Sequence, residues 1–230
     1  MGRKKELPLL EKVRITDIGA EGNAVARVDN MVVFVPMLIP GDVVDIKVIK
    51  KRKKYLEGKV LRFHEYSPYR IKPRCIYFGT CGGCRWQHLP YHQQLHFKSK
   101  QVSDSLTRIG KVEIPEVNEI IGSAEEYYYR NKLEFTFSDR RWLTEEEVRT
   151  GQTFEKEPAL GFHIPGYFDK VLDIKECHLQ PEPSNSIRNS VRKYAIENGL
   201  TFFDLKEQKG FLRNIVIRNS LDGNVMVIVI

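Results

Sequence analysis

The sequence predicts an α+β protein in which a small N-terminal β-barrel precedes a mixed α/β domain with a cysteine-rich loop. Short β-branched runs separated by turn residues fill the first 65 positions, and helical stretches and further strands follow them. The 230 residues include only four cysteines, at Cys75, Cys81, Cys84 and Cys177. With 41% hydrophobic and 29% charged residues, the composition is that of a soluble globular protein.

Five short strands are expected in the first domain. They are Val13–Ile15, Ala24–Val28, Met31–Val35, Val43–Ile49 and Tyr55–Phe63. Glycine, asparagine, aspartate and proline residues lie between them, as turns require. Five strands in such a short stretch fit a small closed barrel of the OB type better than an open sheet. We therefore place the first domain at residues 1–66.

Residues 67–230 are expected to form a second, α+β domain. A proline-containing linker, residues 67–73, leads into the cysteines, and a helix is expected over residues 91–109. A second helix is expected over Ser184–Asn198, with Gly199 as its C-cap. The expected strands are Lys132–Ser138, Leu160–His163, Val171–Ile174, Leu212–Asn219 and Val225–Ile230, the last two joined by a turn at Asp222-Gly223.

The sequence ends on six apolar residues, Val225–Ile230. We expect this strand to be buried, and a buried strand needs neighbours on both sides and a cover over its faces. The second domain is therefore expected to be incomplete, and the sequence to be part of a longer polypeptide.

The net charge of +7 is concentrated in the first third of the sequence. Residues 1–70 hold 15 Lys and Arg against 9 Asp and Glu, whereas the other 160 hold 22 against 21. A charge run is usually a solvated face, but clustering on a small barrel favours binding to a polyanion. The candidate contacts are Lys47, Lys50, Lys51, Arg52, Lys53, Lys54 and Tyr55, together with Arg130 and Lys132 before a later strand.

The cysteines form a C-x5-C-x2-C cluster with one remote fourth member. This spacing is one residue away from an iron–sulfur pattern, C-x4-C-x2-C with a remote cysteine. Gly82 and Gly83 would let the backbone wrap closely around a bulky group. Structural zinc sites more often use two short-spaced pairs, so zinc is a weaker alternative, and unligated or disulfide-bonded cysteines are a third.

No apolar run is long enough to cross a bilayer, and the N-terminus lacks the apolar core of a signal peptide. Cysteines without an export signal indicate the cytosol, where thiols serve metals or chemistry. We expect a cytoplasmic monomer with no membrane association.

Several stretches together resemble one family, the bacterial 23S ribosomal RNA (uracil-5-)-methyltransferases. They are Ser67-Pro68, Arg70, Pro73, Cys75, Phe78-Gly79, Cys81–Cys84, Gln87–Leu89, Tyr129–Lys132, Leu160–His163, Asp173-Ile174 with Cys177, and Leu212–Arg218. The N-terminal barrel resembles the TRAM domain of that family. The resemblance implies that Cys75, Cys81, Cys84 and Cys177 hold a [4Fe–4S] cluster, and that the basic stretch contacts RNA. For Arg130 and Lys132, which lie just before an expected strand, an RNA contact and an ordinary strand edge are both open.

The family reaction, as the resemblance implies, methylates carbon 5 of a uracil with S-adenosylmethionine and needs a cysteine nucleophile, a general base and a cofactor pocket. All four cysteines are assigned to the cluster, and no glycine-rich cofactor loop follows an expected strand. We therefore expect no catalytic and no S-adenosylmethionine-binding residue in this chain. The resemblance also implies that helix 91–109 packs on a methyltransferase domain absent from the sequence.

Two alternatives stay open, and the cysteine spacing counts against a third. The chain could be a stand-alone iron–sulfur or zinc RNA-binding protein, or part of a tRNA-directed uracil-5-methyltransferase. A radical methylthiotransferase would use a C-x3-C-x2-C loop, which the spacing here does not match.

Overall fold

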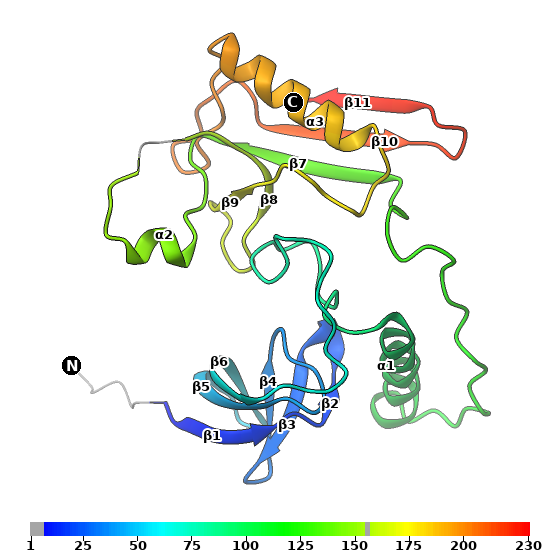
Figure 1. Ribbon diagram of the computed structural model, residues 1–230. Helices are drawn as coiled ribbons and strands as arrows, with labels where there is room; N and C mark the ends of the chain where they lie inside the picture. Colours follow the sequence, from blue (N-terminus) through cyan, green and yellow to red (C-terminus); the bar gives the residue numbers. More distant parts are fainter. Residues whose placement is uncertain (1–6, 155–156) are drawn as a thin grey trace. The chain divides into compact units, whose positions relative to one another are not determined.

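The computed structural model describes residues 7–154 and 157–230, which divide into two compact units (Figure 1). The first unit contains the chain up to Arg74 together with Arg85–Gly122. The second contains Cys75–Cys84 and Ser123–Ile230. The α+β prediction is confirmed, but the division differs from the expected boundary at residue 66, since residues on both sides of the cysteines join the barrel.

The first unit is built on a six-stranded sheet that closes on itself. Its strands are β1 (Leu9–Arg14), β2 (Asp17–Ile18), β3 (Ala24–Val28), β4 (Met31–Val35), β5 (Val43–Lys51) and β6 (Tyr55–Glu65), with a 3-10 turn at Ala20–Gly22. The hydrogen-bonded order is β1-β5-β6-β4-β3-β2. The segment that contains β1 and β2 closes the barrel. At one end of the strand order β1 pairs with β5, and at the other end β2, which directly follows β1 in sequence, pairs with β3. The strands that follow in sequence match the expected ones, and only the two-residue β2 was missed.

The linker after β6 is held to the barrel by a buried ion pair. Asp42 is fully buried, and Arg70 donates to its two carboxylate oxygens from Nε and Nη2 at 2.8 and 2.7 Å. The backbone N–H groups of Ile39 and Ser67 donate to the same carboxylate at 2.9 and 3.0 Å. Four hydrogen bonds satisfy the buried charge, and the compact unit therefore continues beyond residue 66.

Helix α1 (Tyr91–Asp104) continues as one π-helical stretch, Ser105–Ile109, and spans the expected range. Phe97 packs on a small cluster of Ile18, Ile39 and Leu89. Lys100 donates to Asp17 at 2.7 Å. No described residue of α1 is fully buried, and Val102 of α1 and Leu106 of the π-helical stretch are exposed. Docking of this face on another domain stays a prediction.

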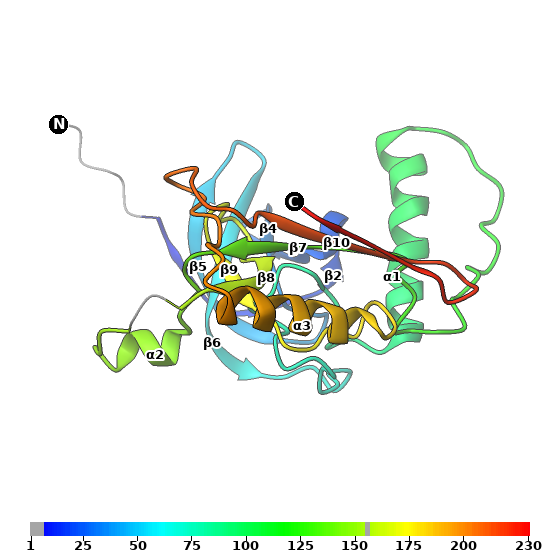
Figure 2. The ribbon, with the colours of Figure 1, turned by 90° about the horizontal axis from the view of Figure 1, so that it is seen from above.

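The second unit is a five-stranded antiparallel sheet with one long helix packed on it. The strands are β7 (Lys132–Ser138), β8 (Ala159–His163), β9 (Val171–Asp173), β10 (Asn214–Asn219) and β11 (Val225–Val229), in the order β11-β10-β7-β8-β9. Helix α3 (Ser184–Glu197) lies along the sheet (Figure 2). Phe135, Ile215 and Ala195 are core residues from the sheet and the helix. The short helix α2 (Glu145–Arg149) was not anticipated.

Helix α3 ends as the sequence predicts. Gly199 adopts φ +64°, and the N–H of Leu200 donates to the carbonyl of Ala195 at 2.9 Å. The expected inward residues Ile187 and Val191 pack against the core beside Ala195. The helix is therefore fixed in length and rotation, which matters because its first turn contacts Cys177.

The β10–β11 hairpin forms with the expected turn, but the expectation of a buried last strand is wrong. Asn219 pairs with Val225, and Gly223 has φ +80°. Each of Val225–Ile230 is between 36% and 58% exposed. The reason is topological: β11 is an edge strand that pairs only with β10 within the described chain.

Within the described ranges, no helix combines the length and apolar character needed to cross a membrane.

Asp42→Asn tests the ion pair that anchors the linker. Removing one partner of a buried pair leaves an unmatched charge, so the free energy of unfolding should fall by about 3 kcal/mol in urea denaturation. Glu65→Gln is the matched control, since the Arg14–Glu65 pair is 60% and 62% exposed and its loss should cost less than about 1 kcal/mol. Equal effects of the two substitutions would show that Asp42 does not anchor the linker.

Candidate metal centre and nucleic-acid interface

The four cysteines come together in the second unit. Cys75, Cys81 and Cys84 are half-buried in the loop of residues 75–84, called the cysteine loop below, and Cys177 is buried just before α3. The Cys81 thiol is near enough to the other three thiols for each of them to raise its pKa. Folding thus gathers residues that 92 intervening positions separate in sequence.

Backbone hydrogen bonds and two glycines shape the cysteine loop. The carbonyl of Tyr77 accepts the N–H of Cys81 at 2.9 Å, and the Gly82 N–H donates to the carbonyl of His163 at 3.2 Å. A Cβ on Gly82 would lie 2.7 Å from that carbonyl oxygen, closer than any side chain tolerates. A Cβ on Gly83 would lie 3.5 Å from the Cys81 Sγ, an ordinary contact. At position 82 the loop therefore needs a residue without a side chain, because the backbone there lies against the carbonyl of His163.

Asn185, in the first turn of α3, holds the fourth cysteine. Its Oδ1 accepts the N–H of Cys177 at 2.8 Å, and its Nδ2 donates to the Cys177 carbonyl at 3.2 Å. Both bonds are buried or nearly so, where they are stronger than in water. The side chain of Asn185 therefore fixes the Cys177 backbone to the helix.

The environment of the thiols suits a site that binds a cationic centre. Burial raises the pKa of the Cys81 thiol to about 12; the Gly83 N–H, 3.4 Å from Sγ, opposes this, and the other three cysteines add to it. Burial likewise raises the pKa of Cys177. Such thiols ionise when a metal coordinates them, because the metal charge offsets both burial and mutual repulsion. Three half-buried thiols and the buried Cys177 thiol therefore supply four sulfur donors to one region of the second unit.

The arrangement gives no support for a single ion. No group of three or more Cys, His, Asp and Glu side chains in the described parts of the chain is placed to hold one metal ion. A tetrahedral zinc with Zn–S of about 2.3 Å would bring its sulfurs within about 3.8 Å of one another. In a four-iron cluster each cysteine binds a different iron, so the sulfurs stand further apart.

Two histidines and a tryptophan near the cysteines in sequence have packing roles. His88 lies in the first unit, and burial lowers its pKa to about 4. His178 contacts the Tyr128 hydroxyl through Nδ1 at 3.3 Å. Trp86 belongs to the first unit, and its Nε1 donates to the Gly22 carbonyl at 3.3 Å. Phe162 lies beside Gly83.

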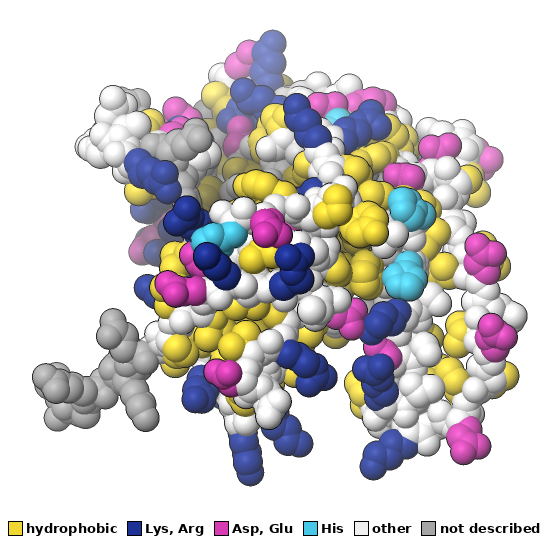
Figure 3. Space-filling view, turned by 60° about the horizontal axis from the view of Figure 1, so that its bottom comes forward, with side chains coloured by type: hydrophobic (Ala, Val, Ile, Leu, Met, Phe, Trp, Pro, Cys, Tyr) yellow, Lys and Arg dark blue, Asp and Glu magenta, His cyan; other side chains and the backbone are white. Residues whose placement is uncertain are grey.

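The predicted basic stretch forms the hairpin of β5, residues 52–54 and β6, called the basic hairpin below. Lys51, Arg52, Lys53 and Lys54 are exposed at its tip, and Lys50 pairs with Glu57 at 2.7 Å. Tyr55 is half-buried and packs edge-on against Phe34, with ring centroids 5.6 Å apart. Figure 3 shows a face on which several Lys and Arg side chains project among hydrophobic ones.

Two lysines of the basic hairpin lie directly opposite each other. The register pairs Lys47 of β5 with Lys59 of β6, both exposed, and neither forms an ion pair with a described residue. Like charges in this position destabilise a sheet. The stability of the fold gives no reason for placing Lys47 opposite Lys59, whereas a bound polyanion would neutralise both charges. Lys59 was not among the predicted contact residues, because only the strand register reveals it.

A second pair of opposed cations lies in the second unit. Arg130 is exposed, and its N–H donates to the Leu179 carbonyl at 2.8 Å. Lys132 of β7 lies opposite Arg218 of β10, beside a hollow that Asn131 and Asn224 also line. Arg218 was quoted for the resemblance but not predicted as a contact. Each unit thus has one cross-strand pair of cations.

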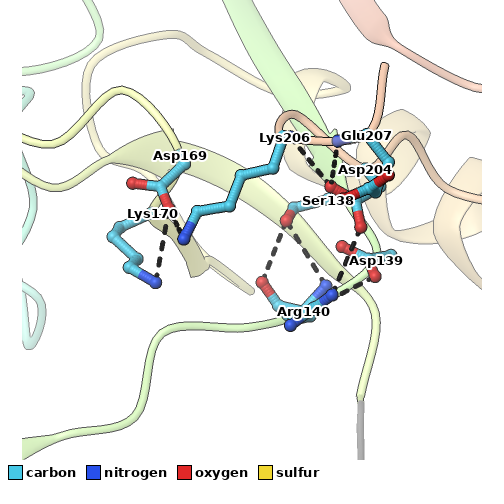
Figure 4. Close-up of polar contacts among 8 residues, drawn as sticks. All are labelled: Ser138, Asp139, Arg140, Asp169, Lys170, Asp204, Lys206 and Glu207. Atoms are coloured by element: carbon cyan, nitrogen blue, oxygen red, sulfur yellow. Dashed lines mark hydrogen bonds and ion pairs between the residues drawn. The ribbon is translucent and has the colours of Figure 1, made fainter. Parts of the chain in front are cut away.

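Another polar pocket of the second unit has its charges matched internally (Figure 4). Its main ionic and polar residues are Ser138, Asp139, Arg140, Asp169, Lys170, Asp204 and Lys206. Arg140 contacts Asp139 and Asp204 at 3.2 and 3.3 Å, and Lys206 contacts Asp169 at 3.0 Å. Because each of these cations has a carboxylate, this pocket offers less unmatched charge to an anion than the opposed pairs do.

Comparison with known proteins places the first unit in a domain family. Residues 11–61 match the TRAM domain, which covers all of β3, β4 and β5 and most of β6. The predicted TRAM barrel is thus confirmed as a domain.

Longer similarities cover nearly the whole chain. A Bacteroides thetaiotaomicron protein named as an uncharacterised RNA methyltransferase is 54% identical over 213 residues, or 93% of this chain and 47% of that protein. A Porphyromonas gingivalis protein of the same name is 48% identical over 95% of this chain and 48% of that protein. The chain thus spans about half the length of the curated relatives it matches.

One solved structure shares the fold. The crystal structure of Pyrococcus abyssi tRNA (uracil-54, C5)-methyltransferase in complex with S-adenosyl-L-homocysteine matches with a TM-score of 0.65 and 24% identity. The match covers 95% of this chain and 45% of that one. This similarity shows a shared fold.

Gly82→Ala and Gly83→Ala form a matched pair that tests the cysteine loop. Gly82→Ala forces the loop away from His163, so it should destabilise the protein by about 1–3 kcal/mol, whereas Gly83→Ala should be close to neutral. Thermal unfolding of both variants measures the difference. A tolerated Gly82→Ala would mean that the loop does not need its close approach to β8.

Proposed function

We propose that this chain is the RNA-recognition part of an S-adenosylmethionine-dependent RNA uracil-5-methyltransferase that acts on 23S ribosomal RNA. The carrying observation is the convergence of all four cysteines in the second unit of a chain whose first unit is a TRAM domain. The similarity to proteins named RNA methyltransferases supports the reaction class. We expect a cytoplasmic monomer.

Cys75, Cys81, Cys84 and Cys177 would hold a [4Fe–4S] cluster. Its contribution when bound is a rigid link between the cysteine loop and the segment that leads into α3. The residues that prepare this link are Gly82, which allows the loop to approach β8, and Asn185, which fixes the Cys177 backbone. The role we propose for the cluster is therefore structural.

RNA binding would rest on cations that the fold leaves unmatched. The opposed pairs Lys47–Lys59 and Lys132–Arg218 lack neutralising carboxylates across their strands, and the tip of the basic hairpin adds Lys51–Lys54. Contacts of this kind give salt-dependent affinity with little sequence information. The two units would hold a folded RNA so that its target uridine can leave the stack.

This chain by itself is not expected to transfer a methyl group. Addition to carbon 6 of uracil needs a free thiolate, and the proposal assigns all four cysteines of the chain to the cluster. The longer relatives would supply that nucleophile in residues beyond the matched half. Transfer of a labelled methyl group from S-adenosylmethionine by this chain alone would contradict this part of the proposal.

A tRNA substrate is the second candidate. It is favoured by the structural similarity to a tRNA (uracil-54, C5)-methyltransferase, although at 24% identity that similarity shows the fold alone. The ribosomal assignment rests on the sequence resemblance.

Metal analysis of anaerobically purified protein tests the cluster. About four irons and four acid-labile sulfides per chain are expected, with loss of both in Cys177→Ser because the fourth ligand is removed. The readouts are iron, sulfide and zinc content and the visible absorption spectrum. One zinc per chain without sulfide would instead support the zinc-stapled alternative.

The double variant Lys47→Gln/Lys59→Gln tests the RNA interface. Losing two phosphate contacts should weaken RNA binding and lower the slope of log K against log salt by about 0.7 per contact. Removing the like-charge pair should leave stability unchanged or raise it by up to about 1 kcal/mol. Binding to a 23S ribosomal RNA fragment and to a tRNA is measured over a salt series.

Lys170→Gln/Lys206→Gln is the control, since it removes the same charge from lysines that pair with Asp169. Equal salt slopes for the two double variants would show that only net charge matters. Tighter binding of the wild type to tRNA than to the ribosomal fragment would favour the second candidate.

A further inference from the structure

Arg188 of α3 is the largest fully buried side chain of the described residues, at 0% exposure. A guanidinium keeps its charge in proteins, and moving it out of water costs several kcal/mol unless an opposite charge compensates. A surface helix such as α3 has no structural need for a buried arginine. Its position therefore calls for an anionic partner.

The contacts of Arg188 are neutral. Nη1 donates to Asn185 Oδ1 at 3.0 Å, and Nη2 donates to Asn189 Oδ1 at 3.3 Å. The guanidinium carbon lies 4.9 Å from the centre of the Phe135 ring. Nε is buried without a hydrogen-bond partner. No carboxylate of the described residues forms an ion pair with Arg188, so nothing in direct contact compensates its charge.

Arg192, one turn further along α3, behaves in the ordinary way. Its Nε donates to Asp173 Oδ1 at 2.9 Å, and its side chain is partly exposed. The same helix thus carries one arginine with a carboxylate and one without. Of these two arginines, Arg188 is therefore the one that has no carboxylate partner among the described residues.

Cys177 is the cysteine that lies beside Arg188, and a shared hydrogen-bond partner joins the two residues. Burial lowers the pKa of Arg188, and among the acidic groups that oppose this Cys177 comes first, ahead of Asp173 and Glu182. Geometry agrees, because Asn185 Oδ1 accepts from both the Cys177 N–H and Arg188 Nη1. One amide oxygen therefore joins the arginine to the fourth cysteine.

We propose that Arg188 is the buried counter-charge of the cluster and raises its reduction potential. This inference rests on the cluster proposed above. A [4Fe–4S] centre with four thiolate ligands is anionic and gains a further negative charge on reduction. A buried cation beside it stabilises the reduced form more than the oxidised form, and little solvent screens that attraction. Arg188 also orients Asn185, so it is a positioning residue for Cys177.

Arg188→Gln and Arg192→Gln are compared in anaerobically purified protein. The measurements are iron and sulfide per chain, the midpoint potential from a redox titration, and the rate at which a chelator removes iron. Arg188→Gln should shift the reduction equilibrium about tenfold toward the oxidised form, about 59 mV for one electron, and should speed iron loss several-fold. Arg192→Gln should match the wild type, and Arg188→Lys should lie close to it because the charge is kept.

Asn189→Asp is the second variant, and it tests the same inference if Arg188→Gln does not fold. It changes an exposed residue and places a carboxylate at Arg188 Nη2, so it should lower the potential in the same direction. An unchanged potential in Asn189→Asp, or identical behaviour of Arg188→Gln and Arg192→Gln, would overturn the inference. A wild-type protein without iron would instead refute the cluster itself, which separates the two failures.

Discussion

The bidentate contact between Asn185 and the backbone of Cys177 is the interaction on which the cysteine site depends. A cysteine just before a helix could face several directions, but two hydrogen bonds from one amide leave it one orientation. The same amide accepts from Arg188, which is buried against Phe135 of the sheet. The position of α3, its packing on the sheet and the position of Cys177 are thereby coupled. Cys177 is therefore held as firmly as the core on which α3 packs.

Local patterns predicted most elements, because their signals lie within a few residues of one another. β3, β4, β7 and α3 fall within a residue or two of the expected bounds. Features set by distant pairing were missed. The linker joins the barrel through an ion pair between Asp42 and Arg70, 28 positions apart, and no local signal marks it. β11 is exposed because of its place at the sheet edge, which apolar composition cannot reveal.

The same distinction separates the two kinds of candidate site residue. The four cysteines stand out by their spacing, because cysteine is rare in this sequence and chemically distinct. The cations could not be ranked, since lysine is common at any surface. Strand register ranks them: Lys47 faces Lys59 and Lys132 faces Arg218, whereas Lys50 is already paired with Glu57. The structure thus reduces a basic stretch to a few residues with unmatched charge.

Unmatched charge also links the surface to the interior. A protein that tolerates two cations side by side on a strand pair, or one cation in its core, accepts a cost that folding alone does not recover. On the surface, a polyanion can offset this cost in Lys132 and Arg218. In the interior no solvent ion can reach Arg188, so the compensating anion has to be part of the folded protein, and the neighbouring thiols are the groups placed to become anionic. The buried arginine and the four cysteines are therefore most simply understood as one site.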